Sequence, residues 1–184
     1  MPPLNDIVWP QGKPNMGGLR DAAYFVPVDD VDFTTPPTLG TNNKVITGDI
    51  ILKATKKWFT FYFTKGTGKI DYTVVGERDG KSFENMAEFN VPGGDAANQA
   101  VIDEILNTPG LLIGKDSSGN QLILGISKNE DNSLNLDLPV YLENAAGTTG
   151  AASADKRGVT ITMKSEAPHS PLHYTGSIDV DDAT

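Results

Sequence analysis

The chain carries the periodicity of a helix in only one stretch, residues 93–110 (GGDAANQAVIDEILNTPG), and elsewhere has the patterns of strands and turns. Asp95 is placed to cap this helix, because its carboxylate can accept hydrogen bonds from the free amides of the first turn. Two or three turns of isolated helix are marginally stable in water. We therefore expect a helix at 95–107 that packs on a sheet through one apolar stripe. The stripe consists of Val101, Ile102, Ile105 and Leu106.

Composition favours a β-rich fold. The 184 residues include 19 glycines and 12 prolines, which indicates many turns. A chain of this length suits one domain and can bury a core without disulfides. We predict a mainly β fold, an antiparallel β-sandwich or barrel flanked by the single α-helix at about 95–107, with long extended loops. Residues 1–18 are expected to form an extended N-terminal arm, and residues 19–184 a single β-rich domain.

Alternation of apolar and polar residues predicts the strands of this domain. The clearest strand is residues 57–64 (KWFTFYFT), in which Phe59, Phe61 and Phe63 share one face. An Asp-Gly pair at 79–80 predicts a hairpin turn. The expected strands are residues 20–28, 45–53, 57–64, 70–74, 83–91, 111–115, 121–126, 134–142, 159–164 and 173–180.

Two internal segments are predicted as loops. Residues 34–43 contain Pro36 and Pro37, which cannot donate hydrogen bonds to a ladder. Residues 145–158 (AAGTTGAASADKRG) are small, polar and flexible. We expect both loops and the arm to be mobile in the isolated chain and to become ordered at contacts with a neighbouring chain.

The charge of the chain argues against a protein that binds nucleic acid through a basic surface. The net charge is −9 and the pI is near 4.6, whereas such affinity comes from Lys and Arg neutralising phosphates. The first twenty residues contain four prolines and no apolar run, so we expect no signal peptide. No stretch approaches the roughly 20 apolar residues that cross a bilayer, so no membrane partner is expected. The absence of cysteine suits a protein folded in a cytoplasm.

No motif in the chain carries a recognisable chemistry. The GTGK run at 66–69 lacks the spacing and the Ser or Thr of a Walker loop, so a hairpin turn is expected there. His169 and His173 are the only histidines, and the prolines beside them disfavour a helix that would place both on one face. The acidic clusters at 29–32 and 179–182 lack the glycine and bidentate glutamate of an EF-hand loop. We predict no catalytic, cofactor-binding or metal-ligating residues.

The prediction that follows is that the protein is not an enzyme. No serine lies in a nucleophile elbow, and no cysteine is present to act as a nucleophile. An enzyme would instead show a deep pocket holding a carboxylate or histidine with a raised pKa. A binding module would show a concave aromatic surface, for example around Trp58 and Tyr62.

Three segments of the chain, 69 of its 184 residues, resemble virion proteins of tailed bacteriophages, most closely the tail tube (major tail) proteins. The stretch NMGGLRDAAYFVPVDDV at 15–31 resembles the start of phage structural proteins. The stretch at 80–106 resembles the strand that leads into their flanking helix, and the stretch at 154–178 resembles their closing strands. These similarities consist of alternation and turn residues, with no chemical signature.

The resemblance implies a structural subunit located in the virion tail and assembled in the host cytoplasm. In that family, subunits form a ring, a hexamer, whose inner strands close a barrel around a channel, and the rings stack into a tube. Other tail or neck proteins of the virion are the implied partners, and there are no catalytic residues to transfer. Neck or tail-completion proteins, capsid decoration proteins and tubes of contractile injection machines are alternatives. A carbohydrate-binding or adhesion β-sandwich is the rival outside virions.

A channel that conducts DNA is expected to have a polar, net negative wall. A wall bearing Lys and Arg would bind phosphates and stall transit, so DNA should pass without specific binding. The candidates to line the wall lie on the polar side of strands, since sheet closure leaves one face free for the channel. The outer surface of the ring is the other position open to them. The candidates are Asp71, Glu84, Glu88 and Asp137.

Overall fold

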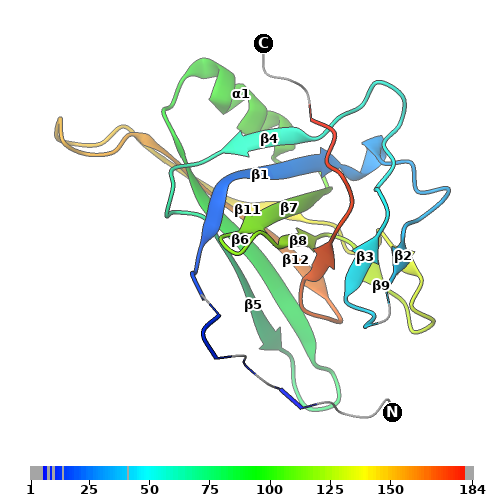
Figure 1. Cartoon of the computed structure of the whole chain (residues 1–184). Coiled ribbons are helices and arrows are strands. Elements are labelled where there is room, and N and C mark those ends of the chain that lie inside the picture. Colours follow the sequence, from blue (N-terminus) through cyan, green and yellow to red (C-terminus); the bar gives the residue numbers. More distant parts are fainter. Residues whose placement is uncertain (1–5, 8, 10, 14, 41, 181–184) are drawn as a thin grey trace.

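The computed structural model describes residues 6–180 except positions 8, 10, 14 and 41. The chain is mainly β, and its two larger sheets pack against each other with one α-helix at their rim (Figure 1). The β-sandwich with a single helix that the sequence predicts is therefore confirmed.

The larger sheet has seven strands. They are β1 (Leu19–Pro27), β2 (Thr38–Leu39), β3 (Val45–Thr47), β4 (Phe59–Tyr62), β7 (Gly110–Asp116), β8 (Gln121–Leu124) and β13 (Leu172–Tyr174). Their order across the sheet is β2-β3-β13-β8-β7-β1-β4. All neighbours are antiparallel except β13 and β3, which run parallel. The prediction of a purely antiparallel domain is wrong at this pair, because only strands joined by a hairpin are obliged to run antiparallel.

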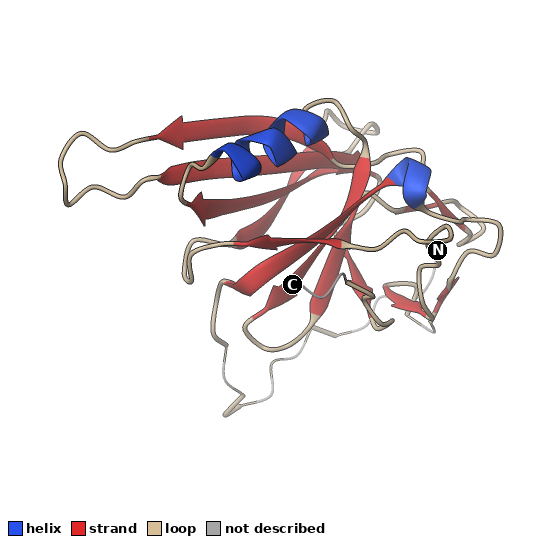
Figure 2. Cartoon of the chain, turned by 90° about the horizontal axis from the view of Figure 1, so that it is seen from above, coloured by secondary structure: helices blue, strands red, loops and turns tan. Residues whose placement is uncertain are grey.

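The second sheet has four strands in the order β11-β12-β6-β5. They are β5 (Lys69–Val75), β6 (Ser82–Pro92), β11 (Tyr141–Thr148) and β12 (Gly158–Ala167). Each neighbouring pair is antiparallel. The hairpins β5–β6 and β11–β12 project from the body of the sandwich in different directions (Figures 1 and 2). A small third sheet pairs β9 (Ser127–Lys128) with β10 (Leu134–Asn135).

The central strands of the seven-stranded sheet are buried on both faces. One face packs on the four-stranded sheet, where Phe25 and Leu112 join Phe89 and Ile161 in one core cluster. The other face carries a second cluster that includes Trp58. This arrangement explains why β7 is a continuous apolar run instead of an alternating one, since both of its sides are covered.

The helix α1 spans Ala96–Ile105 and begins as predicted. Asp95 is its N-cap, and Asp95 Oδ1 accepts a hydrogen bond from the backbone N–H of Asn98 at 2.9 Å. Only half of the predicted stripe is covered: Ile105 is buried and Ile102 packs partly against the core, while Val101 is 39% and Leu106 is 55% exposed. The helix lies at the rim of the sandwich, so only its inner side meets the sheets (Figure 2).

Three predicted strands are much shorter than expected or are divided, and glycine or proline accounts for two of them. The predicted strand 45–53 is β3 alone, because Gly48 adopts a φ of 94° that ends the extended backbone. The predicted strand 134–142 is wrong as a single element, since β10 and β11 belong to different sheets. Pro139, which lacks a ladder donor, lies in the connection between them. The predicted strand 173–180 is likewise reduced to β13.

The two predicted loops are shorter than expected. Short β2 lies within 34–43, where it pairs with β3. β11 continues to Thr148 because its backbone pairs with β12, and backbone pairing does not depend on the small side chains. The connection that remains is turned by Asp155, whose Oδ2 accepts hydrogen bonds from the N–H groups of Ala151 at 2.9 Å and Ala152 at 2.7 Å. These two contacts keep the pKa of the Asp155 carboxyl below its usual value.

Candidate functional site

The side of the four-stranded sheet that faces away from the core is polar. On β6 the residues that alternate with core residues are Glu84, Met86 and Glu88. Their partners across β12 and β5 carry further charges, so this side holds four carboxylates and two ammonium groups and is net negative. We call it the outer face. Its charged residues are Lys69, Asp71, Glu84, Glu88, Lys164 and Glu166.

The structure brings together three of the four predicted wall residues. Asp71 on β5 pairs in register with Met86, between Glu84 and Glu88, so the three carboxylates share the outer face. Asp137 does not lie on the sheet. It lies in the connection between β10 and β11, where its backbone N–H donates to Asn135 Oδ1 at 3.1 Å. Its predicted place on a strand depended on the single strand 134–142, which is wrong.

Two lysines connect the carboxylates of the outer face. Lys69 Nζ lies 2.9 Å from Asp71 Oδ2 and 3.8 Å from Glu88 Oε1. Lys164 Nζ lies 2.9 Å from Glu84 Oε2 and 3.8 Å from Glu166 Oε1. The hydrogen bond that Lys69 donates to Asp71 raises the pKa of Lys69, and the hydrogen bond that Lys164 donates to Glu84 raises the pKa of Lys164. Both ammonium groups therefore stay charged and are occupied by protein carboxylates.

The wall candidates predicted from the sequence are all acids, so Lys69 and Lys164 were missed, and Glu166 was missed because it lies beyond the predicted strand 159–164. The signal was present in the alternation, since Lys164 follows Val159, Ile161 and Met163 on the opposite side of the same strand. What the alternation alone does not contain is the register between strands. That register places Glu166 opposite Glu84, and Lys164 opposite Met86 at the next position on the same face.

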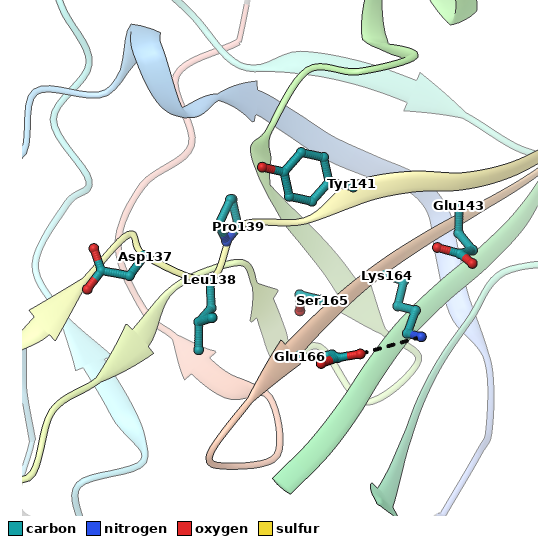
Figure 3. A pocket seen from close by; sticks show the side chains of 8 residues that line it. All are labelled: Asp137, Leu138, Pro139, Tyr141, Glu143, Lys164, Ser165 and Glu166. Atoms are coloured by element: carbon teal, nitrogen blue, oxygen red, sulfur yellow. Dashed lines mark ion pairs between the residues drawn. The ribbon is translucent and has the colours of Figure 1, made fainter.

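A shallow pocket of about 300 Å³ lies beside the outer face (Figure 3). Asp137 and Leu138 reach it from the connection before β11, Glu143 from β11, and Lys164 and Glu166 from β12. Lys164 is already paired in this pocket, and its raised pKa suits a fixed cation instead of a proton acceptor. The pocket is therefore a charged depression beside the sheet.

The four-stranded sheet ends in two strands that have a neighbour on one side only. β5 pairs with β6 and β11 pairs with β12, and no further strand of the described chain pairs with either. Each edge leaves a row of backbone N–H and C=O groups open to another strand. The three successive antiparallel pairings make β5 and β11 run in opposite directions.

The two histidines are in different environments. His169 is buried, and its Nε2 accepts a hydrogen bond from the backbone N–H of Lys128 at 3.2 Å, while Nδ1 lies 2.9 Å from the carbonyl oxygen of Ser170. Burial lowers the pKa of His169, so the ring is held neutral. His173 is exposed on β13. Within the described ranges, no group of three or more His, Cys, Asp or Glu side chains is arranged to hold a metal ion.

The aromatic surface considered for a binding module is only partly present. Trp58 is buried in the second core cluster, so it cannot contribute to a surface. Tyr62 is exposed at the edge of the larger sheet. None of the helices in the described part of the chain is long and apolar enough to cross a bilayer.

Comparison of the chain with protein-family models, with curated proteins and with solved structures gives no match. The outer face and the two open strand edges that border it are the features of the structure that point to a function.

Proposed function

We propose that the protein is a structural subunit of a tailed-phage tail tube, in which copies join into rings that stack around a DNA-conducting channel. The observation that carries the proposal is the form of the four-stranded sheet. Its two edge strands, β5 and β11, are open and run in opposite directions, and one of its faces is polar and net negative. The resemblance of residues 15–31, 80–106 and 154–178 to tail tube proteins supports the same function.

The open edges suit a cyclic assembly. β5 of one copy can lie beside β11 of the next copy as an antiparallel neighbour, because the two strands run in opposite directions. Repeating this joint around an axis closes a barrel and pairs the backbone groups that each edge leaves open. The two surfaces in the joint are different, and a heterologous contact of this kind produces a ring when its rotation closes.

The outer face suits the wall of the channel. The opposite face of the sheet holds the core, so only the outer face is free to turn towards the axis. Asp71, Glu84 and Glu88 would then line the channel, and Asp137 would lie beside the β11 joint. Because the two lysines of this face are paired with carboxylates, the wall offers few free cations to DNA phosphates.

Disulfide trapping tests the joint, and the chain contains no cysteine of its own to interfere. One cysteine is placed on β5, at Asp71 or Thr73, and one on β11, at Asn144 or Ala146, so that the four combinations scan the register. Within one copy, β5 and β11 are three strand spacings apart, about 14 Å. That separation is too long for a disulfide, which needs Cα atoms within about 7 Å.

The expected result for a correct combination is a ladder of linked species on a denaturing gel that ends at the copy number of the ring, six for the family it resembles. Each single-cysteine variant is the matched control and should form dimers at most. Electron microscopy of the wild-type protein should show rings or tubes. A strict monomer in light scattering at high protein concentration, together with no ladder in any combination, contradicts the proposal.

Neck, tail-completion and decoration proteins and tubes of contractile machines are the alternatives that would use a similar joint. Stacking separates the first three from a tail tube, since a tube subunit forms long stacks of rings in micrographs whereas they form single rings or bind to capsids. A carbohydrate-binding β-sandwich would remain monomeric and bind a glycan.

A further inference from the structure

An apolar surface lies at the β4 edge of the larger sheet, between β4 and α1. It is a groove of about 260 Å³, which we call the α1–β4 groove. Phe59 and Tyr62 of β4 are 51% and 60% exposed there, and Val101 of α1 forms the opposite side. The volume is below the roughly 300–1,000 Å³ that is typical of small-molecule sites, so the groove suits one or two side chains.

The groove adjoins an open strand edge. β4 is the last strand of the larger sheet and pairs with β1. Just before β4, Trp58 bridges Val180, and just beyond it the N–H of Thr64 donates to the carbonyl oxygen of Asn90, so the open part of this edge is the stretch 59–62. An extended segment that lies along β4 can form main-chain hydrogen bonds with this edge and insert side chains into the groove. The groove therefore suits an extended chain with large apolar side chains.

The arm before β1 is a segment of this kind. Ile7 is fully exposed, Trp9 is 60% exposed and Met16 is 68% exposed, so the arm carries large apolar side chains that the fold does not bury. Its described residues form no helix or strand. From Gly18 back to Trp9 the arm can span about 30 Å when extended.

The arm of the same copy is held on the wrong side of β1 to reach the groove. Ser117 Oγ donates to the carbonyl oxygens of Gly17 at 2.9 Å and Gly18 at 3.0 Å, which fixes the base of the arm beside the β7–β8 turn. Trp9 and Met16 also lie beside that turn. In the sheet, β7 and β4 lie on opposite sides of β1. Figure 1 shows the arm running away from α1 and β4.

Charge favours the arm as the occupant. The stretch 82–114, which contains α1, includes Asp103 and Glu104 and has no Lys or Arg. The arm contains Lys13, four residues after Trp9, and Asp6, three residues before it. Its two charges cancel, so the whole net charge of −9 lies on the rest of the chain, and the arm is the part that the acidic helix repels least.

We propose that the α1–β4 groove binds the N-terminal arm of a second copy, with the Trp9 indole against Phe59, Tyr62 and Val101. This contact goes beyond the joint between β5 and β11 and does not depend on it. Arm and groove are different surfaces, so the contact continues from copy to copy. Where the groove meets the four-stranded sheet, it is lined by Val91 and Ile161 of the core side and not by residues of the outer face.

Cross-linking tests the contact and leaves Trp9 in place. The variant carries Gln11→Cys in the arm and Asn98→Cys beside the groove, and both side chains are accessible. Oxidation should link separate copies into dimers and longer species. The matched control replaces the second cysteine with Glu130→Cys, an exposed position in the β9–β10 turn, and should stay unlinked. A disulfide that forms within one copy overturns the proposal.

Fluorescence gives an independent measurement. The chain has two tryptophans, and Trp58→Phe leaves Trp9 as the only indole. Its emission should shift to the blue as protein concentration rises, and Tyr62→Ser should raise the concentration of half-maximal shift about tenfold or more. Ile51→Ser, at another half-exposed apolar residue outside the groove, is the control and should leave the shift unchanged. An emission that is independent of concentration overturns the proposal even where the β5–β11 ladder forms.

Discussion

The ammonium group of Lys164 on β12 lies 2.9 Å from a carboxylate oxygen of Glu84 on the adjacent strand β6. Glu84 is itself directly opposite Glu166 in the register, so two like charges face each other across the pair. Lys164 reaches both of them, at 2.9 Å and 3.8 Å. The lysine thus offsets a repulsion that the strand pairing creates.

Replacing Lys164 with Met should destabilise the fold and do so more at low salt. The substitution leaves Glu84 and Glu166 opposed without a cation, and added salt screens their repulsion. Urea denaturation at low and high ionic strength measures the difference. Lys57→Met is the control, because its partner Asp179 has no opposing carboxylate in register with it. A loss of stability for Lys164→Met that does not shrink with salt contradicts this reading.

Reversing the charge of the outer face should create DNA binding. The double variant Asp71→Lys, Glu88→Lys adds two cations and releases Lys69 from its two carboxylates. Retardation of DNA should appear at low salt and disappear as salt rises, because each phosphate contact adds about 0.9 to the slope of log K against log salt. Asp137→Lys, off the sheet, is the matched control and should bind less. Tight DNA binding by the wild-type protein contradicts a wall that repels DNA.

The two ends of the helical stripe should respond differently to a charge. Ile105→Asp puts an unpaired carboxylate into the core and should cost about 3–5 kcal/mol in the free energy of unfolding. Leu106→Asp changes the neighbouring, exposed residue and should be tolerated. Thermal or urea denaturation of both variants compares them directly. Equal losses would show that the rim position of α1 is incorrect.

The cap of α1 should contribute measurably to stability. Asp95→Ala removes the acceptor of the Asn98 N–H and should cost about 1 kcal/mol, whereas Asp95→Asn keeps an acceptor and should cost less. Urea denaturation of the two variants gives the comparison. A loss for Asp95→Asn as large as for Asp95→Ala would show that the hydrogen bond is not the cause.

Acidification should destabilise the fold through His169. Burial lowers the pKa of this ring in the folded chain below its ordinary value of 6.5. Below about pH 6.5 the unfolded chain therefore takes up a proton that the folded chain does not, so stability falls as pH decreases from there towards the lowered pKa. Urea denaturation between pH 5 and 8 measures this slope. His169→Gln should flatten it in that window.

Local signals predicted what depends on neighbours in sequence. The Asp-Gly pair at 79–80 gives the β5–β6 hairpin, and Asp95 gives the start of α1. Alternation along single strands also predicted that Asp71, Glu84 and Glu88 lie on the side of their strands that faces away from the core. These features need only a few consecutive residues, and their physics is the same in any fold.

Features that depend on distant strands could not be read in this way. The parallel pairing of β3 with β13 joins segments more than a hundred residues apart, and no local pattern encodes it. The partners of Lys164 require the register between β12 and β6. Asp137 was placed on a strand because leucines alternate on both sides of Pro139, although the chain changes sheets there. The burial of Val101 and Leu106 was overestimated because a helical stripe does not reveal how much of it a sheet covers.

Strand number has a consequence for the size of a ring. A closed barrel that alternates strand direction at every junction needs an even number of strands, and a unit of four supplies an even number whatever the number of copies. Parity therefore places no restriction on ring size, and every junction is chemically equivalent in a small or a large ring. Diameter is left to the angle at which neighbouring copies meet, which contacts outside the barrel control. Substitutions at those contacts should change the width of a tube without changing how its strands pair.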